Sequence, residues 1–238
     1  KKVVKEPIAW GALVLLLLMD LIGINSTYVH SDQFVSKRKH EQAFQPTAAD
    51  RAILQDTTHY RVFEPNLRLS SARTAYFHKA IGGYHAAKPR RFQELYDFYL
   101  SKNHPQVINM MNIKYIIQPS QNNPLGVSKN TAAFGNVWFV NELKAVPDAN
   151  AELLALEHTD LRSQAVTRDR SSQQYPKDSL ATIRLQSYKP NELIYESDTS
   201  QKQLAVFSEI YYPNGWDVYI DDQPATHFKA NYLLRAME

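Results

Sequence analysis

Few residues in this chain are spaced as catalytic groups usually are. The sequence has no Walker phosphate loop, no GxSxG turn and no HExxH motif, and His40-Glu41 lacks the second histidine one helical turn later. The histidines are scattered, and a glycine pair separates His78 from His85. With no cysteine, disulfides, thiolate metal sites and thiol catalysis are excluded. We expect no catalytic residue, metal site or cofactor in this chain.

Three aspartates near the C-terminus, Asp217, Asp221 and Asp222, are the remaining candidates for a cation site. Asp221-Asp222 is better explained as a hairpin turn, because short acidic side chains bond to their own backbone there. We therefore favour the turn over the cation site.

The most distinctive chemistry lies in the block FSEIYYPNGW, residues 207–216, followed by ANYLLRA, residues 230–236. Tyr211, Tyr212 and Trp216 form either a flat face for stacking sugars or the filling of a core, and the core is the commoner use of aromatics. Glu209 stands out in an apolar strand. An unpaired buried carboxylate would protonate, so we expect it to pair with Arg235 or to accept hydrogen bonds from Asn231.

Short strands and turns surround this block and predict an antiparallel β-sandwich over residues 179–238. The turns are marked by Pro190-Asn191, Pro213-Asn214-Gly215 and Asp221-Asp222. The strands are expected at residues 179–187, 192–196, 203–211, 216–220 and 232–235. The last of these stops at the end of the sequence, so we expect the sandwich to be incomplete.

Residues 47–161 alternate helical and strand patterns and predict a mixed α/β subdomain. Thr47 with Asp50 suits a helix start near residue 47, and Asp148 suits another. Pro89 opens a helix whose apolar stripe includes Phe92, Leu95 and Tyr96. A helix is also expected at 105–111, and strands are expected at 60–63, 113–117 and 137–146. The polar segment 162–178 is expected to be a linker.

The N-terminal run from Ile8 to Tyr28 is long and apolar enough for a transmembrane helix, expected over residues 8–29 after a flank at 1–7. Trp10 and Tyr28 bracket it where interfacial rings usually sit. A signal peptide fits less well, because Asp20 interrupts the apolar core and no small-x-small cleavage site follows. A buried helix of a soluble protein is the other alternative. Residues 30–46 are expected to be a linker.

Asp20 is the one charged residue inside this run. A carboxylate near the middle of a lipid-facing helix costs about 2.5–3.5 kcal/mol on insertion scales. It is tolerated where other helices or a wet cavity surround it, which predicts companion helices outside this chain. A neutral Asp20, or one beside a polar neighbour, is favoured over a proton-relay role.

Composition and charge limit the classes of binding partner and indicate the orientation of the N-terminal helix in the membrane. A net charge of +3, without a basic run interleaved with aromatics, argues against nucleic-acid binding. Lys1, Lys2 and Lys5 favour a cytoplasmic start for the helix and an exterior position for the rest, although residues 37–39 blunt this signal. With no initial Met, we expect the chain to be a piece of a longer protein. The fold class is therefore α+β with one transmembrane helix.

In these motifs the sequence resembles the C-terminal region of bacterial YfhO-type membrane proteins. The similar pieces, in family order, are MDLIGIN before Tyr28, IGGYH at 81–85, NMMNIKYII at 109–117 and the C-terminal block. The family resembles polytopic glycosyltransferases of the C superfamily. The resemblance makes one set of residues a family signature of unknown role: Ser208, Glu209, Tyr211, Tyr212, Pro213, Gly215, Trp216, Asn231 and Arg235.

The resemblance implies a polytopic protein in the bacterial inner membrane that moves a sugar from a polyprenyl-phosphate carrier to an exterior acceptor. The catalytic carboxylate of that superfamily lies in an early exterior loop, so no residue here inherits it. The chain would supply a late helix and an exterior, periplasmic-side domain. Its partners would be the bilayer, further helices of the parent protein and a glycan or lipid acceptor. The alternative is a non-catalytic envelope module with a single anchor, for glycan binding or scaffolding.

Overall fold

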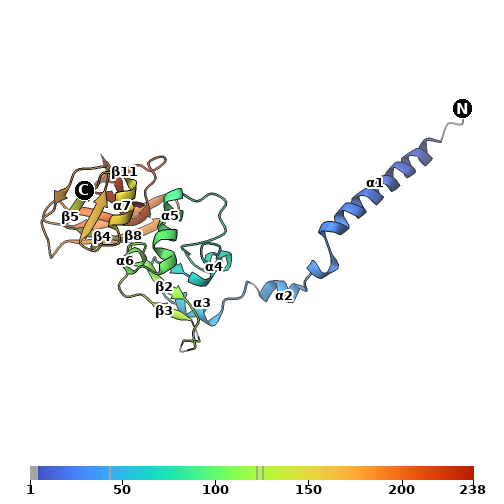
Figure 1. Cartoon of the computed structure of the whole chain (residues 1–238), viewed down its shortest axis with the longest axis horizontal. Helices are drawn as coiled ribbons and strands as arrows, with labels where there is room; N and C mark the ends of the chain where they lie inside the picture. The colour runs from blue at the N-terminus through green and yellow to red at the C-terminus, as the bar shows by residue number, and fades with distance from the viewer. Residues whose placement is uncertain (1–4, 43, 122, 125) are drawn as a thin grey trace. The chain divides into compact units, whose positions relative to one another are not determined.

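The chain divides into two units, Lys1–Gln45 and Pro46–Glu238 (Figure 1). The computed structural model describes residues 5–42, 44–121, 123–124 and 126–238, so Lys1 and Lys2 of the predicted flank lie outside the described residues. Helices and strands are both abundant, and most paired strands are antiparallel. The α+β class predicted from the sequence is confirmed.

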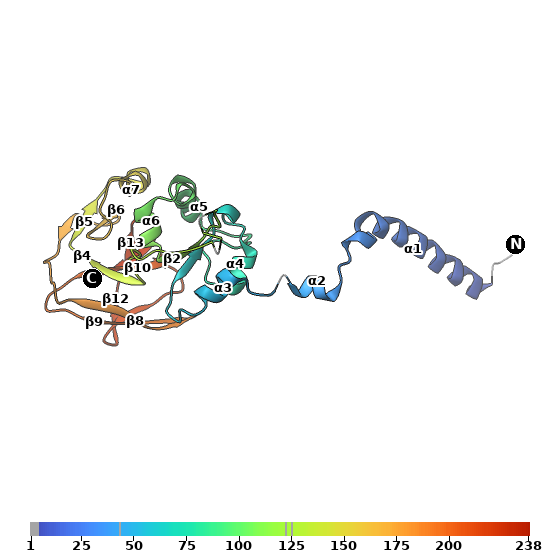
Figure 2. The same cartoon turned by 90° about the horizontal axis from the view of Figure 1, so that it is seen from below.

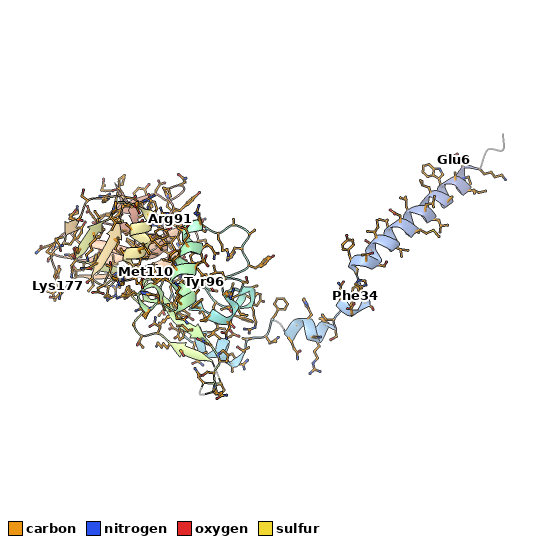
Figure 3. All side chains as sticks on the ribbon, viewed as in Figure 1. Glu6, Phe34, Arg91, Tyr96, Met110 and Lys177 are labelled. Carbon is orange, nitrogen blue, oxygen red and sulfur yellow. The ribbon has the colours of Figure 1, made fainter. Side chains whose placement is uncertain are left out.

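The first unit consists mainly of one apolar helix, α1 (Glu6–Tyr28). Pro7 lies in its first turn, where a missing N–H is tolerated, and the helix ends where Val29 becomes extended. None of its residues is buried, and its side chains project on all sides (Figure 3). Its mean hydropathy of 2.2 makes it apolar enough to cross a membrane. The predicted linker that follows contains a 3-10 turn, Ser31–Gln33, and the short helix α2 (Lys37–Gln42).

A four-stranded antiparallel sheet lies at the centre of the second unit. Its strand order is β13-β14-β10-β4. Strand β10 is the long middle strand, and Val206 pairs with Trp138 on one side and with Ala236 on the other. The bounds are β4 (Val137–Val140), β10 (Leu204–Ile210), β13 (Phe228–Ala230) and β14 (Leu234–Met237).

Helices cover one face of this sheet and enclose the main core. Figure 2 shows α5 (Arg90–Phe98), α6 (Pro105–Met110) and α7 (Ala149–Ala155) on one side of β10 and β13. Leu95 of α5 and Met110 of α6 are fully buried there with Val206 and Leu234. Tyr96 and Met110, labelled in Figure 3, belong to the same cluster. The apolar stripe predicted for α5 therefore faces this core.

The opposite face is covered by a hairpin, β8 (Thr182–Lys189) and β9 (Glu192–Asp198). Its cluster is smaller: Val137, Ala205 and Phe207 of the sheet meet Ile183 and Tyr195 of the hairpin. Figure 2 shows the hairpin on the side of the sheet away from the helices. This packing has the sheet-on-hairpin form of a small sandwich, but β4 comes from the predicted first subdomain. The two predicted subdomains thus share one sheet.

The segment 162–178, expected as a linker, contains two strands. β6 (Gln164–Thr167) lies parallel to β5 (Glu142–Ala145), and β7 (Gln173–Gln174) lies antiparallel to it. Ala165 and Val166 are fully buried. The predicted strand 137–146 is in fact two strands, because β4 and β5 belong to different sheets. Polar composition hid a buried strand here because only four residues of the segment form it.

The start of the unit forms a second small sheet. β1 (Arg61–Phe63) runs parallel to β2 (Ile113–Ile117), and β3 (Val127–Lys129) lies antiparallel to β2. Helix α3 (Ala48–Ile53) begins with the predicted cap, since Asp50 N donates to Thr47 Oγ1 (3.2 Å) and Thr47 N donates to Asp50 Oδ2 (2.7 Å). Asn112 adopts a left-handed conformation (φ 52°) between α6 and β2. Helix α4 (Ala72–Phe77) and the 3-10 turn Pro65–Leu67 follow β1, whereas the 3-10 turn Leu100–Lys102 follows α5 and adds Leu100 to the main core.

A last hairpin, β11 (Val218–Ile220) and β12 (Gln223–Ala225), turns at Asp221-Asp222. Both aspartates have positive φ, 48° and 63°, as a two-residue hairpin turn requires. The turn interpretation of these residues is confirmed.

Candidate functional site

Two residues of the signature, Ser208 and Glu209, form a bulge in β10. The pairing with β14 shifts between Phe207 and Ile210, which leaves these two residues outside the regular ladder. The Ser208 hydroxyl lies 2.7 Å from the Met110 carbonyl oxygen and 2.8 Å from that of Gly135. Bulges re-aim side chains, and this one holds Glu209 beside the start of β1.

Glu209 pairs with an arginine that the sequence did not suggest. Arg61 Nη2 lies 3.0 Å from Glu209 Oε1, and both side chains are about 15% exposed. Arg61 Nη1 also donates to the Met111 carbonyl oxygen (3.0 Å). The expected direct partners, Arg235 and Asn231, are not bonded to Glu209 among the described residues, so that expectation is wrong. Arg61 is 148 residues away along the chain, and only the fold brings it close.

Arg235 instead lies against Trp216. Its guanidinium carbon is 4.7 Å from the centre of the indole ring, within the range of a cation–π contact. Arg235 is 8% exposed. Burial lowers its pKa, and the nearby Glu209 charge opposes that shift. Glu209 therefore lies between two guanidinium groups, bonded to one and acting at a distance on the other.

The signature aromatics do not fill a core. Trp216 and Tyr211 are half-buried, Tyr212 is 58% exposed, and Pro213 and Gly215 lie in the exposed turn between them. The Tyr211 ring lies 5.1 Å from that of His227. The expectation of a core is wrong for Tyr211, Tyr212 and Trp216, because all three lie beyond the end of β10. Their rings do not stack on one another among the described contacts.

Asn231 has a structural role. It is fully buried with φ 50°, and its side-chain oxygen accepts a hydrogen bond from Val166 N (2.9 Å). Its own N–H donates to the Val166 carbonyl oxygen (2.7 Å). Asn231 thus joins the loop before β14 to β6, inside the segment expected as a linker.

A cavity of about 670 Å³ opens beside this cluster, under strand β8. Its walls come from residues 57–59 before β1, residues 134–137 leading into β4, residues 183–186 and Tyr188 of β8, and Lys79. This volume lies within the usual range for small-molecule sites. The cavity is the candidate binding site of the second unit.

His59 in this cavity is held in one tautomer. Its Nδ1 lies 2.6 Å from Asn136 Oδ1, while Asn136 Nδ2 donates to the His59 carbonyl oxygen (3.2 Å). Because Asn136 thereby presents an acceptor to the ring, Nδ1 carries the proton and Nε2 carries a lone pair. Burial, with the charges of Lys79 and Arg61, lowers the pKa of His59 to about 4. Nε2 is buried and has no hydrogen-bond partner among the described residues.

Tyr188 connects the cavity to the signature cluster. Its ring is stacked on His59 at 3.7 Å between centroids, and Lys79 Nζ lies 5.0 Å from the ring centre. Burial and then the charge of Glu209 raise the pKa of the Tyr188 hydroxyl. Burial and repulsion from Arg61 lower the pKa of Lys79.

Two other buried carboxylates hold the fold together. Asp50 is fully buried and receives hydrogen bonds from Arg73 and from His78 Nε2 (3.0 Å). These bonds, with those of Thr47, hold the pKa of Asp50 well below its usual range although burial opposes them. Glu152 is fully buried beside Arg91 (3.4 Å), and burial raises its pKa. Within the described ranges no three histidines or carboxylates gather as metal ligands would.

The sequence had not singled out His59, Arg61, Lys79 or Tyr188 as site residues. Each is an ordinary polar or aromatic residue in its local context, and none belongs to a short motif. The alternation expected over residues 179–187 ends before Tyr188, and the register of β8 shifts between Leu185 and Ser187, so period-two alternation gave no signal for Tyr188.

No family model, curated protein or solved structure matches this chain. The geometry of the molecule must therefore support any functional statement.

Proposed function

We propose that this chain is the late helix and exterior binding region of a polytopic, glycosyltransferase-like membrane protein of the bacterial envelope. In this proposal α1 is one of several transmembrane helices, and the Pro46–Glu238 unit holds the saccharide acceptor outside the inner membrane. The parent protein uses a polyprenyl-phosphate sugar, and its catalytic carboxylate lies on a segment outside this chain.

The single observation that carries the proposal is the surface of α1. Leu13 to Leu18 are 47–65% exposed, and no residue of the helix is buried. Exposed apolar surface is unfavourable in water by about 25 cal/mol per Å², so such a helix requires lipid or other helices around it. Asp20 favours other helices, and not lipid alone, around at least part of the surface of α1, because an isolated carboxylate is unfavourable in lipid.

Glu209, a carboxylate beside the cavity, is part of an ion pair, which favours a binding role for the unit over catalysis. Glu209 is paired with Arg61 at 3.0 Å and lies near Arg235. The carboxylate is therefore engaged by a guanidinium group of the protein and does not belong to the lining of the cavity. The unit therefore suits recognition, with the chemistry performed by another part of the parent protein.

The test uses the full-length parent protein in its native membrane. Deletion of residues 46–238 is expected to abolish sugar transfer to the envelope acceptor while the remaining helices still insert. A phosphatase fused after Glu238 of the intact protein is expected to be active, because the unit lies outside the cytoplasm. Transfer that continues after the deletion, or an inactive phosphatase, would refute the proposal.

Asp20 provides a sharper test of the companion helices. We expect Asp20→Leu to improve insertion of α1 as a single helix by about 2–3 kcal/mol but to lower the yield of folded parent protein. Leu17→Asp, three residues earlier on the same helix, serves as the matched control and should impair both. If the Asp20→Leu variant gave the same yield of folded parent protein as the wild type, and the parent protein bound glycan without transferring sugar, the single-anchor module would be favoured.

A further inference from the structure

We propose that the cavity under β8 binds a saccharide unit that carries one carboxylate or phosphate group. Lys79 binds the anionic group, and His59 Nε2 accepts a hydrogen bond from a sugar hydroxyl. The proposal rests on the proposed function only for the saccharide origin of the ligand. The site itself follows from the side chains that line the cavity.

The charge of the lining selects an anion. Its charged members are Lys79 and Arg184, and no carboxylate belongs to it. Arg184 is already paired with Glu196 at 2.7 Å, whereas Lys79 forms no ion pair among the described residues. Arg61, just outside, is paired with Glu209 at 3.0 Å. Lys79 is therefore the cation available to a ligand.

The unpartnered nitrogen of His59 selects a hydroxyl donor. Nδ1 is engaged by Asn136, so Nε2 offers a lone pair. A buried acceptor without a donor is unfavourable, and a hydroxyl can supply the missing bond. The stack with Tyr188 fixes the direction of the ring, so the lone pair keeps one orientation.

The rest of the lining mixes neutral polar and apolar side chains. Thr57 brings a hydroxyl group to the cavity, whereas the amides of Asn136 and Gln186 are already bonded to His59 and Glu196. Phe134, Val137 and Leu185 are apolar. A sugar ring presents both hydroxyl groups and apolar C–H surface, so it matches this mixture.

The test titrates the full chain, residues 1–238 in detergent micelles at pH 7 and low salt, with glucuronate, glucose 6-phosphate and glucose. We expect at least one anionic probe to bind about tenfold more tightly than glucose, as a charge-assisted hydrogen bond would provide. Tighter binding of glucuronate identifies a sugar acid, and tighter binding of glucose 6-phosphate identifies a sugar phosphate. Equal affinity for all three probes, or binding of none, overturns the proposal.

Two variants locate the site. Lys79→Met keeps the length of the side chain and is expected to remove the preference for anions, whereas Lys177→Met, an exposed lysine at the edge of the unit (Figure 3), should leave it unchanged. His59→Phe keeps a ring beside Tyr188 and should weaken every probe that binds by about fivefold. An unchanged anion preference in Lys79→Met refutes the assignment.

A direct measurement covers the case in which His59→Phe fails to fold. In the wild-type chain, the ¹⁵N chemical shift of His59 Nε2 should move when the anionic probe saturates the protein, because the lone pair gains a donor. A constant shift at saturation overturns the role of His59. Failure of any of these tests leaves the transfer and topology measurements of the parent protein intact, so the two proposals fail separately.

Discussion

The two faces of the β13-β14-β10-β4 sheet are built differently. The face under α5, α6 and α7 belongs to the large core, where Leu204, Val206 and Leu234 are fully buried. The face under β8–β9 has a small apolar cluster and, beside it, the cavity and the Arg61–Glu209 pair. One face stabilises the unit, and the other leaves room for polar side chains. The candidate binding cavity lies where the apolar packing is thin.

The largest expected effect comes from thinning the helix-covered face. Leu204→Ala should lower the free energy of unfolding by about 2–5 kcal/mol, because it leaves a cavity in a closed core. Ile183→Ala under the hairpin is the matched change on the other face and should cost about 1 kcal/mol, since Ile183 is only partly buried. Urea unfolding of both variants measures the difference, and equal losses would remove the contrast between the faces.

Breaking the ion pair of the hairpin-covered face should have the next largest effect. Arg61→Met leaves Glu209 without its partner in a largely buried position and should cost about 2–3 kcal/mol. A double-mutant cycle with Glu209→Gln should give a coupling energy clearly above zero. The same cycle between Glu209 and Arg235 should give a smaller value, because no direct bond joins them among the described contacts. A larger coupling energy between Glu209 and Arg235 than between Glu209 and Arg61 would mean that Arg235 is the ion-pair partner of Glu209.

The pH dependence of stability should report on His59. Its pKa is about 4 when folded and 6.5 as the ordinary value, so between these values the unfolded chain binds a proton that the folded chain does not. Stability should therefore fall by about 1–2 kcal/mol from pH 7 to pH 5, allowing for partial exposure. His227, whose pKa burial also lowers, adds to the same trend.

His59→Phe should reduce this slope, and the exposed His158→Phe should keep it. Unfolding measured in urea at each pH separates the two variants. A slope that is unchanged by His59→Phe would mean that burial does not lower the pKa of this ring in the folded protein.

The smallest effect is expected at Trp216, where the sequence alone favoured a core residue. Trp216 is half-buried and contacts Arg235, so Trp216→Ala should cost about 1 kcal/mol. Trp138 is 3% exposed and donates to the Leu161 carbonyl oxygen (3.0 Å), so Trp138→Ala should cost about 3–5 kcal/mol. Thermal unfolding of the two variants measures the difference, and a similar loss of stability in both would mean that Trp216 is a core residue.

Local features of the fold were predictable and the long-range ones were not. The Thr47 and Asp148 caps, the apolar stripe of α5 and the Asp221-Asp222 turn all depend on neighbours within a few residues, and the structure has them as expected. Residues 162–178 were expected to be a linker, but they contain β6, which is buried by β5 and by the loop at Asn231. The polar composition of the segment gives no information about these distant partners.

The sequence by itself determined an apolar helix with one carboxylate inside it, the mixture of helices and strands, and the caps and turns that punctuate them. These depend on hydrophobic runs, period and backbone preference, which act between near neighbours. Only the tertiary structure decided which arginine neutralises Glu209 and that His59, Lys79 and Tyr188 line one cavity. Those contacts join segments more than a hundred residues apart, such as Arg61 and Glu209, and chain distance alone gives no information about them.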